Sequence, residues 1–474
     1  MASYRSRRDL LRAGGLAIGG LAVGGGVLAE AFGASAATTR AAASPWDQVP
    51  GILAQIVPPT FGPATFDVTA FGATGDGKTD CTAAFAKAIA ACTAAPGGGH
   101  VVVPAGTFLT GAVRLRSNVD LHVSPGATVK FSTDPKKYPT VFTRWQGIEC
   151  MNFSPFIYAN GSTNVAITGG GTLDGQAAAG PWFDYDAKRQ PDWDKLQQQA
   201  VDNVPVAKRV YGPGHFLKPN FVQLYKCSNV LVADVHLRNS AMWNLHPVLC
   251  TNVTISNVSV FSRGAMVDGC DPESSKLVHV TGCQFDTGDD GVVVKSGRDA
   301  DGRRVNVPSE NIVIDNCKFL GRWGAITVGS EMSGGVRNVF AQDCTIAKGS
   351  TYTSFYAVYI KTNKRRGGFV DGVYVRRLSG GPESKGGIFV DMNYSLTGPG
   401  AGAIVNPVVR NIGVDGLTLK GAPFAVRLNG LAASHVAHVH VSNSTFTDIA
   451  DPTIKATNAD DVTFTNVTVN GKAV

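Results

Sequence analysis

A short strand pattern returns along most of this chain and limits its fold more than any other feature. Each copy is a brief stretch of alternating apolar and polar residues, followed by Gly, Asn, Asp or Ser turn residues and a second strand. The copies begin at Asn118, Asn164, Asn229, Asn252, Leu277, Asn311, Val336, Val370, Val408, Val439 and Val462. Many of the intervals are about 23 to 34 residues, a range that indicates a solenoid.

Such short strands predict a stack of coils. One coil cannot bury its inner face alone, so the coils must stack, and their inward Val, Ile and Leu side chains then form one continuous core. A propeller would show regular blades of about 40 to 45 residues, and a sandwich would not sustain one repeat for so long. We therefore predict one all-β domain over residues 61–474, a single-stranded parallel β-helix, although about 150 residues per domain would suggest three domains.

A helix and a linker are predicted before the first copies. Phe85 and Ile89 have helical spacing between Thr79 and Ala94, after a plausible cap at Asp80. This helix would cover the open N-terminal coil, whose strand edges would otherwise invite pairing. Residues 37–60 are rich in Ala, Thr and Pro without clear periodicity, which indicates a linker.

The first 36 residues have the features of an export signal. Ser6-Arg7-Arg8-Asp9-Leu10-Leu11 is a twin-arginine signature, an apolar Gly-rich stretch follows, and Ala34-Ser35-Ala36 is a small-residue cleavage site. A membrane anchor is the alternative, but the stretch is weakly hydrophobic and interrupted by Gly. We expect the twin-arginine export machinery to be a partner, the product to be secreted or periplasmic in a bacterium, and no stable membrane insertion.

Charge and cysteine content exclude some classes. The formal charge of +7 would favour approach to a polyanion only weakly, and the basic residues are scattered, so nucleic-acid binding is not expected. The nine cysteines include no CxxC pair, which argues against a zinc site or a thioredoxin-like motif. We expect mostly buried thiols, with one or two disulfides formed late. The sequence does not indicate an oligomeric state.

A glycine-rich segment competes for the function. Gly72-Ala73-Thr74-Gly75-Asp76-Gly77-Lys78-Thr79 fits the phosphate-binding loop pattern between a strand and a helix. However, no alternating strand–helix pattern follows, and an exported protein would meet no ATP. We interpret the segment as a turn between the first strand and the capping helix.

Four carboxylates form the stronger candidate site. Asp268 and Asp271 are followed by Asp289 and Asp290, within 23 residues of a chain poor in charge. Asp268 and Asp289 are 21 residues apart, close to one coil, so they can lie side by side. Neighbouring carboxylates raise at least one pKa, and glycosidic cleavage needs one protonated acid and one ionised base. A Ca²⁺ site and Asp-rich turns are the alternatives.

Several motifs in one order make the chain resemble glycoside hydrolase family 28, the polygalacturonases and their pectinase relatives, with similarity to the bacterial exo-acting branch. They are Gly75-Asp76-Gly77-Lys78-Thr79-Asp80, Gly169-Gly170-Gly171-Thr172-Leu173-Asp174-Gly175, Trp243-Asn244-Leu245-His246-Pro247 and Ser330-Glu331-Met332-Ser333-Gly334-Gly335-Val336-Arg337. The resemblance implies a right-handed parallel β-helix with an open groove, a pectic substrate, and inversion without a metal or other cofactor. It makes Asp289 the general acid, while Asp268 and Asp290 activate the water.

Two family motifs are altered. The Gly-His-Gly motif falls on Arg322-Trp323-Gly324, and the Arg-Ile-Lys motif falls on Tyr359-Ile360-Lys361. The resemblance implies that the Arg and Lys hold a sugar carboxylate on the leaving-group side, where a tyrosine cannot replace a guanidinium. A neutral rhamnose there, as in rhamnogalacturonan, is therefore an alternative to galacturonate. In the opposing interpretation, Arg322, Lys364, Arg365 or Arg366 supplies the charge.

The predicted substrate-binding residues follow from these motifs: Lys361, Tyr359, Trp323, Arg322, His246 and Asp271. His246 is as well explained by a buried, hydrogen-bonded side chain, and Lys295 could face either the groove or solvent. The insert from Gly175 to Leu217 is the loop expected to block one groove end. Exo action is expected from the similarity to bacterial exo-acting members of the family. A polysaccharide lyase and a non-catalytic carbohydrate-binding solenoid are the other classes considered.

Overall fold

The computed structural model describes residues 44–396, 398 and 403–474. The predicted export signal lies outside the described residues, as does the beginning of the predicted linker. Within the part that is described, no helix is both long enough and apolar enough to cross a membrane.

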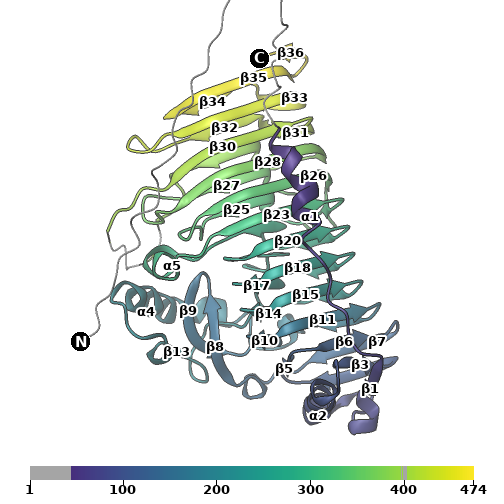
Figure 1. The fold of residues 1–474 in the computed structure, drawn as a ribbon. Helices are drawn as coiled ribbons and strands as arrows, with labels where there is room; N and C mark the ends of the chain where they lie inside the picture. The colour runs from purple at the N-terminus through teal and green to yellow at the C-terminus, as the bar shows by residue number, and fades with distance from the viewer. Residues whose placement is uncertain (1–43, 397, 399–402) are drawn as a thin grey trace, which may run out of the picture. The chain divides into compact units, whose positions relative to one another are not determined.

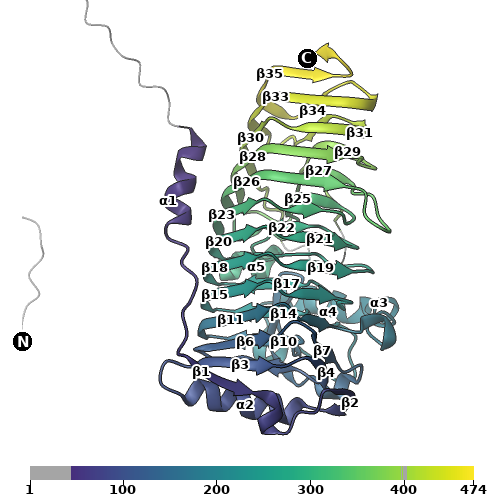
Figure 2. The same ribbon diagram turned by 90° about the vertical axis from the view of Figure 1, so that its right-hand side faces the viewer.

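The chain from Ala64 onward winds as a right-handed parallel β-helix, as predicted (Figures 1 and 2). The first face consists of β1 (Ala64–Asp67), β3 (Gly99–Val103), β6 (Val119–Val123), β11 (Thr163–Gly169), β15 (Ser228–Ala233), β18 (Thr251–Ser256), β20 (Lys276–Thr281), β23 (Ser309–Asp315), β26 (Val336–Ala347), β28 (Phe369–Gly381), β30 (Val408–Asp415), β33 (Val436–Asp451) and β35 (Ala459–Val469). The second face contains β2 (Asp76–Asp80), β4 (Gly106–Thr110), β7 (Ala127–Phe131), β12 (Thr172–Asp174), β16 (His236–Arg238), β19 (Ser259–Ser262), β21 (Gln284–Thr287), β24 (Lys318–Phe319) and β31 (Thr418–Phe424), and the long strands β26, β28 and β33 continue into it.

The third face carries the candidate site. It begins with β5 (Val113–Arg114), β10 (Ile157–Asn160), β14 (Val222–Tyr225) and β17 (Leu245–Val248), and continues with β22 (Val292–Val294), β25 (Gly324–Gly329), β27 (Tyr356–Lys361), β29 (Gly386–Asp391), β32 (Val426–Asn429) and β34 (Lys455–Thr457). Single bridges through Cys270 join β17 to β22. A short antiparallel strand, β36 (Lys472–Ala473), pairs with β35 at the C-terminal end.

The repeat determines both the core and one row of turns. Val119, Val165, Val230, Val253 and Val278 occupy one register position on neighbouring strands and are fully buried. Just before this position lie Asn118, Asn164, Asn229 and Asn252, all with positive φ, each hydrogen-bonded through its side chain to the next. Asparagine tolerates this left-handed conformation better than most residues, so the turn and the stack favour the same residue.

Helix α2 (Thr82–Ala94) packs against the first coil and buries Phe85 and Ile89, as predicted. It begins three residues later than expected, because residues 76–80 form β2. Its N-cap is Cys81 and not Asp80 as predicted, although the Asp80 carboxylate accepts from the Thr82 N–H at 2.9 Å. Residues 72–75 of the glycine-rich segment form a turn after the 3₁₀ helix η2 (Val68–Phe71), as interpreted, whereas residues 76–79 belong to β2.

The linker prediction is wrong for residues 45–53. These residues form the 3₁₀ helix η1 (Pro45–Gln48) and α1 (Val49–Leu53), which lies alongside the first face (Figure 2). Val49, Ile52 and Ile56 pack with Val313 and Phe340 of that face in a small apolar cluster. Apolar contacts with the sheet stabilise these helices, although residues 37–60 show no clear periodicity of their own.

An excursion of the chain lies beside the third face (Figure 1) and builds a second, smaller core. It contains the antiparallel pair β8 (Thr140–Trp145) and β9 (Ile148–Phe153), preceded by the 3₁₀ helix η3 (Pro135–Lys137), and the insert with η4 (Ala177–Ala179), α3 (Tyr185–Lys188), α4 (Gln190–Val201), η5 (Val206–Lys208) and β13 (Val210–Tyr211). Trp145, Trp193, Leu196, Met242 and Trp243 are buried together in its core. Helix α5 (Asp299–Val305) contacts α4.

All nine cysteines are buried and free in this structure. The buried thiols agree with the prediction, whereas the one or two expected disulfides are not formed.

Candidate active site

Three aspartates converge just before the strands of the third face. Asp268 and Asp290 lie on adjacent coils, where the Gly269 N–H donates to the Asp290 carbonyl at 2.9 Å. One carboxylate oxygen from each of Asp268, Asp289 and Asp290 lies within 4.8 Å of the others. The 21-residue spacing therefore corresponds to one coil, and stacking brings these carboxylates together.

Asp290 is held by a lysine and by hydrogen bonds to both carboxylate oxygens. The Lys361 ammonium donates to its Oδ2 at 2.6 Å. Its Oδ1 accepts from the Gly324 N–H at 2.9 Å and from the Thr327 hydroxyl at 3.2 Å. These contacts fix the position of the Asp290 carboxyl group within the cluster.

Asp289 is arranged to keep its proton. Burial raises its pKa well above the usual range, and the negative charges of Asp268 and Asp290 raise it further. Its oxygens accept hydrogen bonds from the Met266 and Asp290 amides at 3.1 and 3.0 Å, which orient the carboxyl group. A protonated carboxyl beside an ionised one is the division of labour that glycosidic cleavage needs.

Asp268 is buried beside Lys295, and its pKa is raised. Burial raises its pKa to about 6, although the Lys295 ammonium lies 3.4 Å from its Oδ2 and opposes that rise. Asp271, which was predicted to bind substrate, is fully buried and is not among the described residues that line the pocket. Burial raises its pKa well above the usual range, and the charge of Asp268 adds to this.

The carboxylate cluster is close enough to be considered as a metal site. However, the ammonium groups of Lys295 and Lys361 already lie beside Asp268 and Asp290. A divalent cation placed among the three oxygens would face two fixed positive charges at short range, which disfavours its binding. The donor set therefore fits acid–base chemistry better than a metal.

The aspartates line a pocket of about 360 Å³. Its described lining residues are Gln146, Arg189, Gln190, Trp193, Trp243, Met266, Asp268, Asp289, Asp290, Lys295, Arg298, Trp323, Ser330, Glu331, Lys361, Arg366, Tyr394 and Ser395. Five of these are cationic and four are carboxylates. Because Asp289 holds a proton, the lining favours an anionic ligand.

Glu331 connects the cations of the pocket. Its carboxylate lies 3.1 Å from Lys295, 3.0 Å from Arg298 and 4.0 Å from Arg366. Burial alone would raise the pKa of Glu331, but these three cations hold it well below the usual range. Burial and the neighbouring charge of Arg366 lower the pKa of Arg298 to about 10, so two guanidinium groups share one carboxylate here.

The structure separates the residues predicted from the altered motifs. Lys361 and Trp323 line the pocket, with the ammonium 5.3 Å from the indole ring centroid. Tyr359 is buried in an aromatic cluster, parallel to Phe389 with ring centroids 5.6 Å apart. Arg322 is exposed on the outer side and stacks on Phe355.

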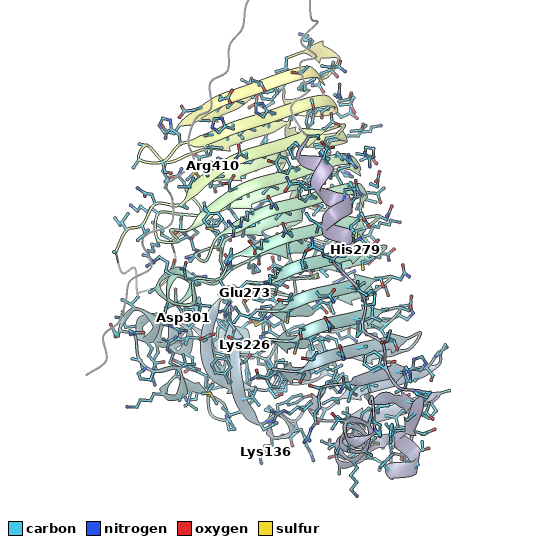
Figure 3. All side chains as sticks on the ribbon, viewed as in Figure 1. Lys136, Lys226, Glu273, His279, Asp301 and Arg410 are labelled. Atoms are coloured by element: carbon cyan, nitrogen blue, oxygen red, sulfur yellow. The ribbon has the colours of Figure 1, made fainter. Side chains whose placement is uncertain are left out.

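His246 is a buried structural residue, the alternative that its motif left open. Its Nε2 lies 2.7 Å from Glu273, and its Nδ1 lies 3.0 Å from the Gln223 amide. Glu273, labelled in Figure 3, also pairs with Arg144 of β8 at 3.2 Å. His246 is not among the described lining residues, whereas Lys295 faces the pocket rather than solvent.

Several lining residues were not found from the sequence. Gln146 comes from the β8–β9 turn, Arg189 and Trp193 come from the insert, and Arg298 leads into α5. No spacing rule connects these segments to the aspartates, and only their tertiary packing brings them together. The one available signal was the length and polarity of the insert, which predicted a loop at one groove end. Of the alternative cations considered at the altered motif, Arg366 lines the pocket.

The right-handed β-helix and its pocket of paired acidic groups together define the class as a glycoside hydrolase. The sequence profile of glycosyl hydrolases family 28 matches residues 92–406. The chain therefore belongs to glycosyl hydrolases family 28.

Comparisons with individual proteins agree with this. A probable polygalacturonase of Vitis vinifera is 28% identical over 79% of this chain and 72% of its own length. An exo-poly-alpha-D-galacturonosidase of Dickeya chrysanthemi is 28% identical over 70% of this chain, and the match spans 58% of that protein. The crystal structure of a hyperthermoactive exopolygalacturonase from Thermotoga maritima is 39% identical, with a TM-score of 0.85 over 90% of this chain and 96% of that one.

Proposed function

We propose that the protein is an exo-acting polygalacturonase, which releases galacturonate units from the end of a pectic chain. The observation that carries the proposal is the pocket itself. Acid and base carboxylates lie in a cavity whose lining holds five cationic side chains and whose boundary includes the insert. The names of the Thermotoga maritima and Dickeya chrysanthemi relatives support the same activity.

In the proposed reaction, Asp289 donates its proton to the glycosidic oxygen as the bond to the anomeric carbon breaks. Asp268 and Asp290 accept a proton from a water molecule, whose oxygen forms the new bond to that carbon. The products are a galacturonate hemiacetal and a shortened chain with a free hydroxyl. General acid and base groups of this kind each contribute about 10²–10⁴-fold to the rate.

Inversion is proposed from the family resemblance, and the site geometry makes its measurement informative. The nearest oxygens of the three carboxylates lie within 4.8 Å of one another. Inverting glycosidases usually separate their two carboxyl groups by about 6.5–9.5 Å to admit the water, and retaining enzymes by about 5–5.5 Å. Proton NMR during hydrolysis of a galacturonide will show the β-anomer first if the reaction inverts, and the α-anomer first if it retains.

The pocket favours galacturonan over rhamnogalacturonan. The hypothesis of a neutral leaving-group sugar assumed that Tyr359 replaces a carboxylate-binding arginine at the substrate. In the structure Tyr359 is 3% exposed behind the pocket, whereas Lys361 and Arg366 line it. We propose that Arg366 supplies the positive charge that the arginine of the altered motif would carry, since a guanidinium can hold a uronate carboxylate.

Exo action follows from the position of the insert. The family resemblance places the leaving group near Lys361, on a coil beyond the catalytic aspartates. The insert packs against the pocket, where Arg189 donates to the Met266 sulfur at 3.2 Å and Trp193 stacks on Arg298. This position of the insert would limit how far a substrate chain extends through the pocket, which favours attack at a chain end.

The substrate also bears on where the protein acts. Pectic polymers lie outside the cell that degrades them, and the twin-arginine signature provides an export route, so we propose a secreted or periplasmic enzyme. Replacing Arg7 and Arg8 with Lys should retain the product in the cytoplasm. Equal export of this variant would contradict the twin-arginine route.

Product chromatography tests the activity directly. Polygalacturonate and rhamnogalacturonan are digested side by side, with Asp289→Asn as the inactive control. Monogalacturonate released from polygalacturonate from the first time points supports exo action on galacturonan. A ladder of long oligomers would overturn the exo assignment, and release from rhamnogalacturonan alone would overturn the substrate assignment.

A further inference from the structure

Lys218 is a buried lysine directly after the insert, and the predicted site does not explain its role. Its side chain is fully buried, and its ammonium pairs with Asp186 of α3 at 2.8 Å. The ammonium also lies 5.4 Å from the Phe183 ring centroid. Burying a charged ammonium costs free energy that one ion pair rarely offsets, so a functional reason is expected for such a residue.

The second hydrogen bond of Lys218 leads to the catalytic acid. Its ammonium donates to the Ala265 carbonyl at 3.1 Å. The same peptide group carries the Met266 N–H, which donates to Asp289 Oδ2 at 3.1 Å. Polarising a carbonyl strengthens the N–H donor of its own peptide, because hydrogen bonds in series reinforce one another in a low-dielectric interior.

The Ala265–Met266 peptide is fixed at further points by the excursion. Met266 has φ 60°, a conformation that its own preferences disfavour. Its sulfur accepts from the Gln146 amide at 2.7 Å and from Arg189 at 3.2 Å. Arg189 in turn lies 3.5 Å from Asp186, the ion-pair partner of Lys218. Lys218 therefore holds this peptide by its carbonyl, and Gln146 and Arg189 of the excursion hold it by the Met266 side chain.

We propose that Lys218 is a positioning residue for catalysis, which acts through the Ala265–Met266 peptide to orient the Asp289 carboxyl group toward the glycosidic oxygen. This inference rests on the proposed role of Asp289 as general acid. It gives the insert a second role, because the segment that closes the pocket also aligns the acid.

The charges around Asp289 fix the expected direction of the pH effect. Asp268 and Asp290 raise its pKa, and Lys295 and Lys361 lower it. Lys218 is a further cation that interacts with Asp289, and its own neighbours are Asp186 and Arg189. Removing the Lys218 charge should therefore raise the pKa of Asp289 and move the alkaline limb of kcat/KM to higher pH.

Leaving-group dependence distinguishes positioning of the acid from general structural damage. The leaving oxygen of digalacturonate must be protonated as the glycosidic bond breaks. In 4-nitrophenyl α-galacturonide the leaving group is 4-nitrophenolate, a weak base that departs with little need for a general acid. Lys218→Met should lower kcat on digalacturonate about ten-fold, part of the about 10²–10⁴-fold that a general acid contributes, with KM and the nitrophenyl substrate little affected. Lys218→Arg, which keeps the charge, should recover much of the loss.

Two controls make the test decisive. Lys226→Met removes an exposed lysine, labelled in Figure 3, and should leave both substrates and the pH profile unchanged. Asp289→Asn should show a larger loss with the same leaving-group selectivity, and without that selectivity the acid assignment itself fails. Equal losses on both substrates in Lys218→Met, or an unmoved alkaline limb, would overturn the inference about Lys218 alone. If Lys218→Met does not fold, Asp186→Asn keeps the lysine but releases its anchor, and the same selectivity is expected.

Discussion

Replacing Glu331 with Gln should destabilise the protein far more than the loss of an ordinary ion pair. The Glu331 side chain is buried, and its carboxylate faces Lys295, Arg298 and Arg366 at 3.1, 3.0 and 4.0 Å. Glutamine has almost the same shape, so the change removes one charge and leaves the packing intact. The three buried cations would then lose the negative charge of this carboxylate. Removing one partner of a buried ion pair costs about 3–5 kcal/mol.

The matched control is Glu310→Gln on the surface. Glu310 pairs with Arg337 at 2.7 Å, but the arginine side chain is half exposed. Such a pair contributes about 0.2–1 kcal/mol. Urea unfolding followed by circular dichroism, with both variants measured at pH 7, gives the two free-energy differences directly.

The pH dependence supplies a second check. The pKa of Glu331 is held well below its usual range in the folded protein, so the unfolded chain takes up the proton first as pH falls. The stability that Glu331 contributes is present above the unfolded-state value of about 4.3 and is lost below it, toward the folded-state pKa. The gap between wild type and Glu331→Gln should therefore narrow below about pH 4. A gap of less than 1 kcal/mol at pH 7, or one unchanged at pH 3.5, would refute this reasoning.

Three further predictions concern the base, the turn row and the N-terminal helices. Activity should fall below about pH 6, because Asp268 must ionise to act as a base and its pKa is about 6. Lys295 lowers this pKa, so Lys295→Met should move the acid limb of the kcat/KM profile to higher pH. An unmoved limb would exclude Asp268 as its source. Asn229→Ala should lower the free energy of unfolding by about 2–4 kcal/mol, because it removes two side-chain hydrogen bonds and places alanine at a positive φ. Asn229→Gly should avoid the backbone strain and lose only the hydrogen bonds. Equal losses of stability for the two variants in urea unfolding would argue against strain. Trp46→Ala should lower the free energy of unfolding by about 1–2.5 kcal/mol. The centroid of the Trp46 ring lies 5.4 Å from that of Phe340 and 4.0 Å from the Arg376 guanidinium carbon. No change in stability in urea unfolding would mean that this segment does not reinforce the sheet.

The coil repeat and the clustering of the three aspartates could be predicted because both depend on local rules. A strand followed by a left-handed asparagine gives the same coil wherever it occurs, and Asn118, Asn164 and Asn229 marked the coils directly. Asp268 and Asp289 were found together because their spacing equals one coil, and stacking converts that spacing into contact.

The rest of the pocket was decided by packing between segments far apart in the sequence. Arg298 and Arg366 belong to loops that follow different strands, and Trp193 belongs to a helix of the insert, so no periodicity links them. The sequence suggested that the loss of an arginine at Tyr359 removes a uronate contact. In the structure Tyr359 is buried and Arg366 lines the pocket, so we propose that Arg366 supplies this charge. Residues 45–53 were interpreted as a linker for a similar reason, since the apolar surface that stabilises their helices belongs to strands more than 200 residues away. The sequence by itself determined the coil and the cluster of three aspartates proposed to react, because each depends on one repeating unit. The tertiary structure decided the shape and charge of the pocket, because these depend on which distant segments come into contact.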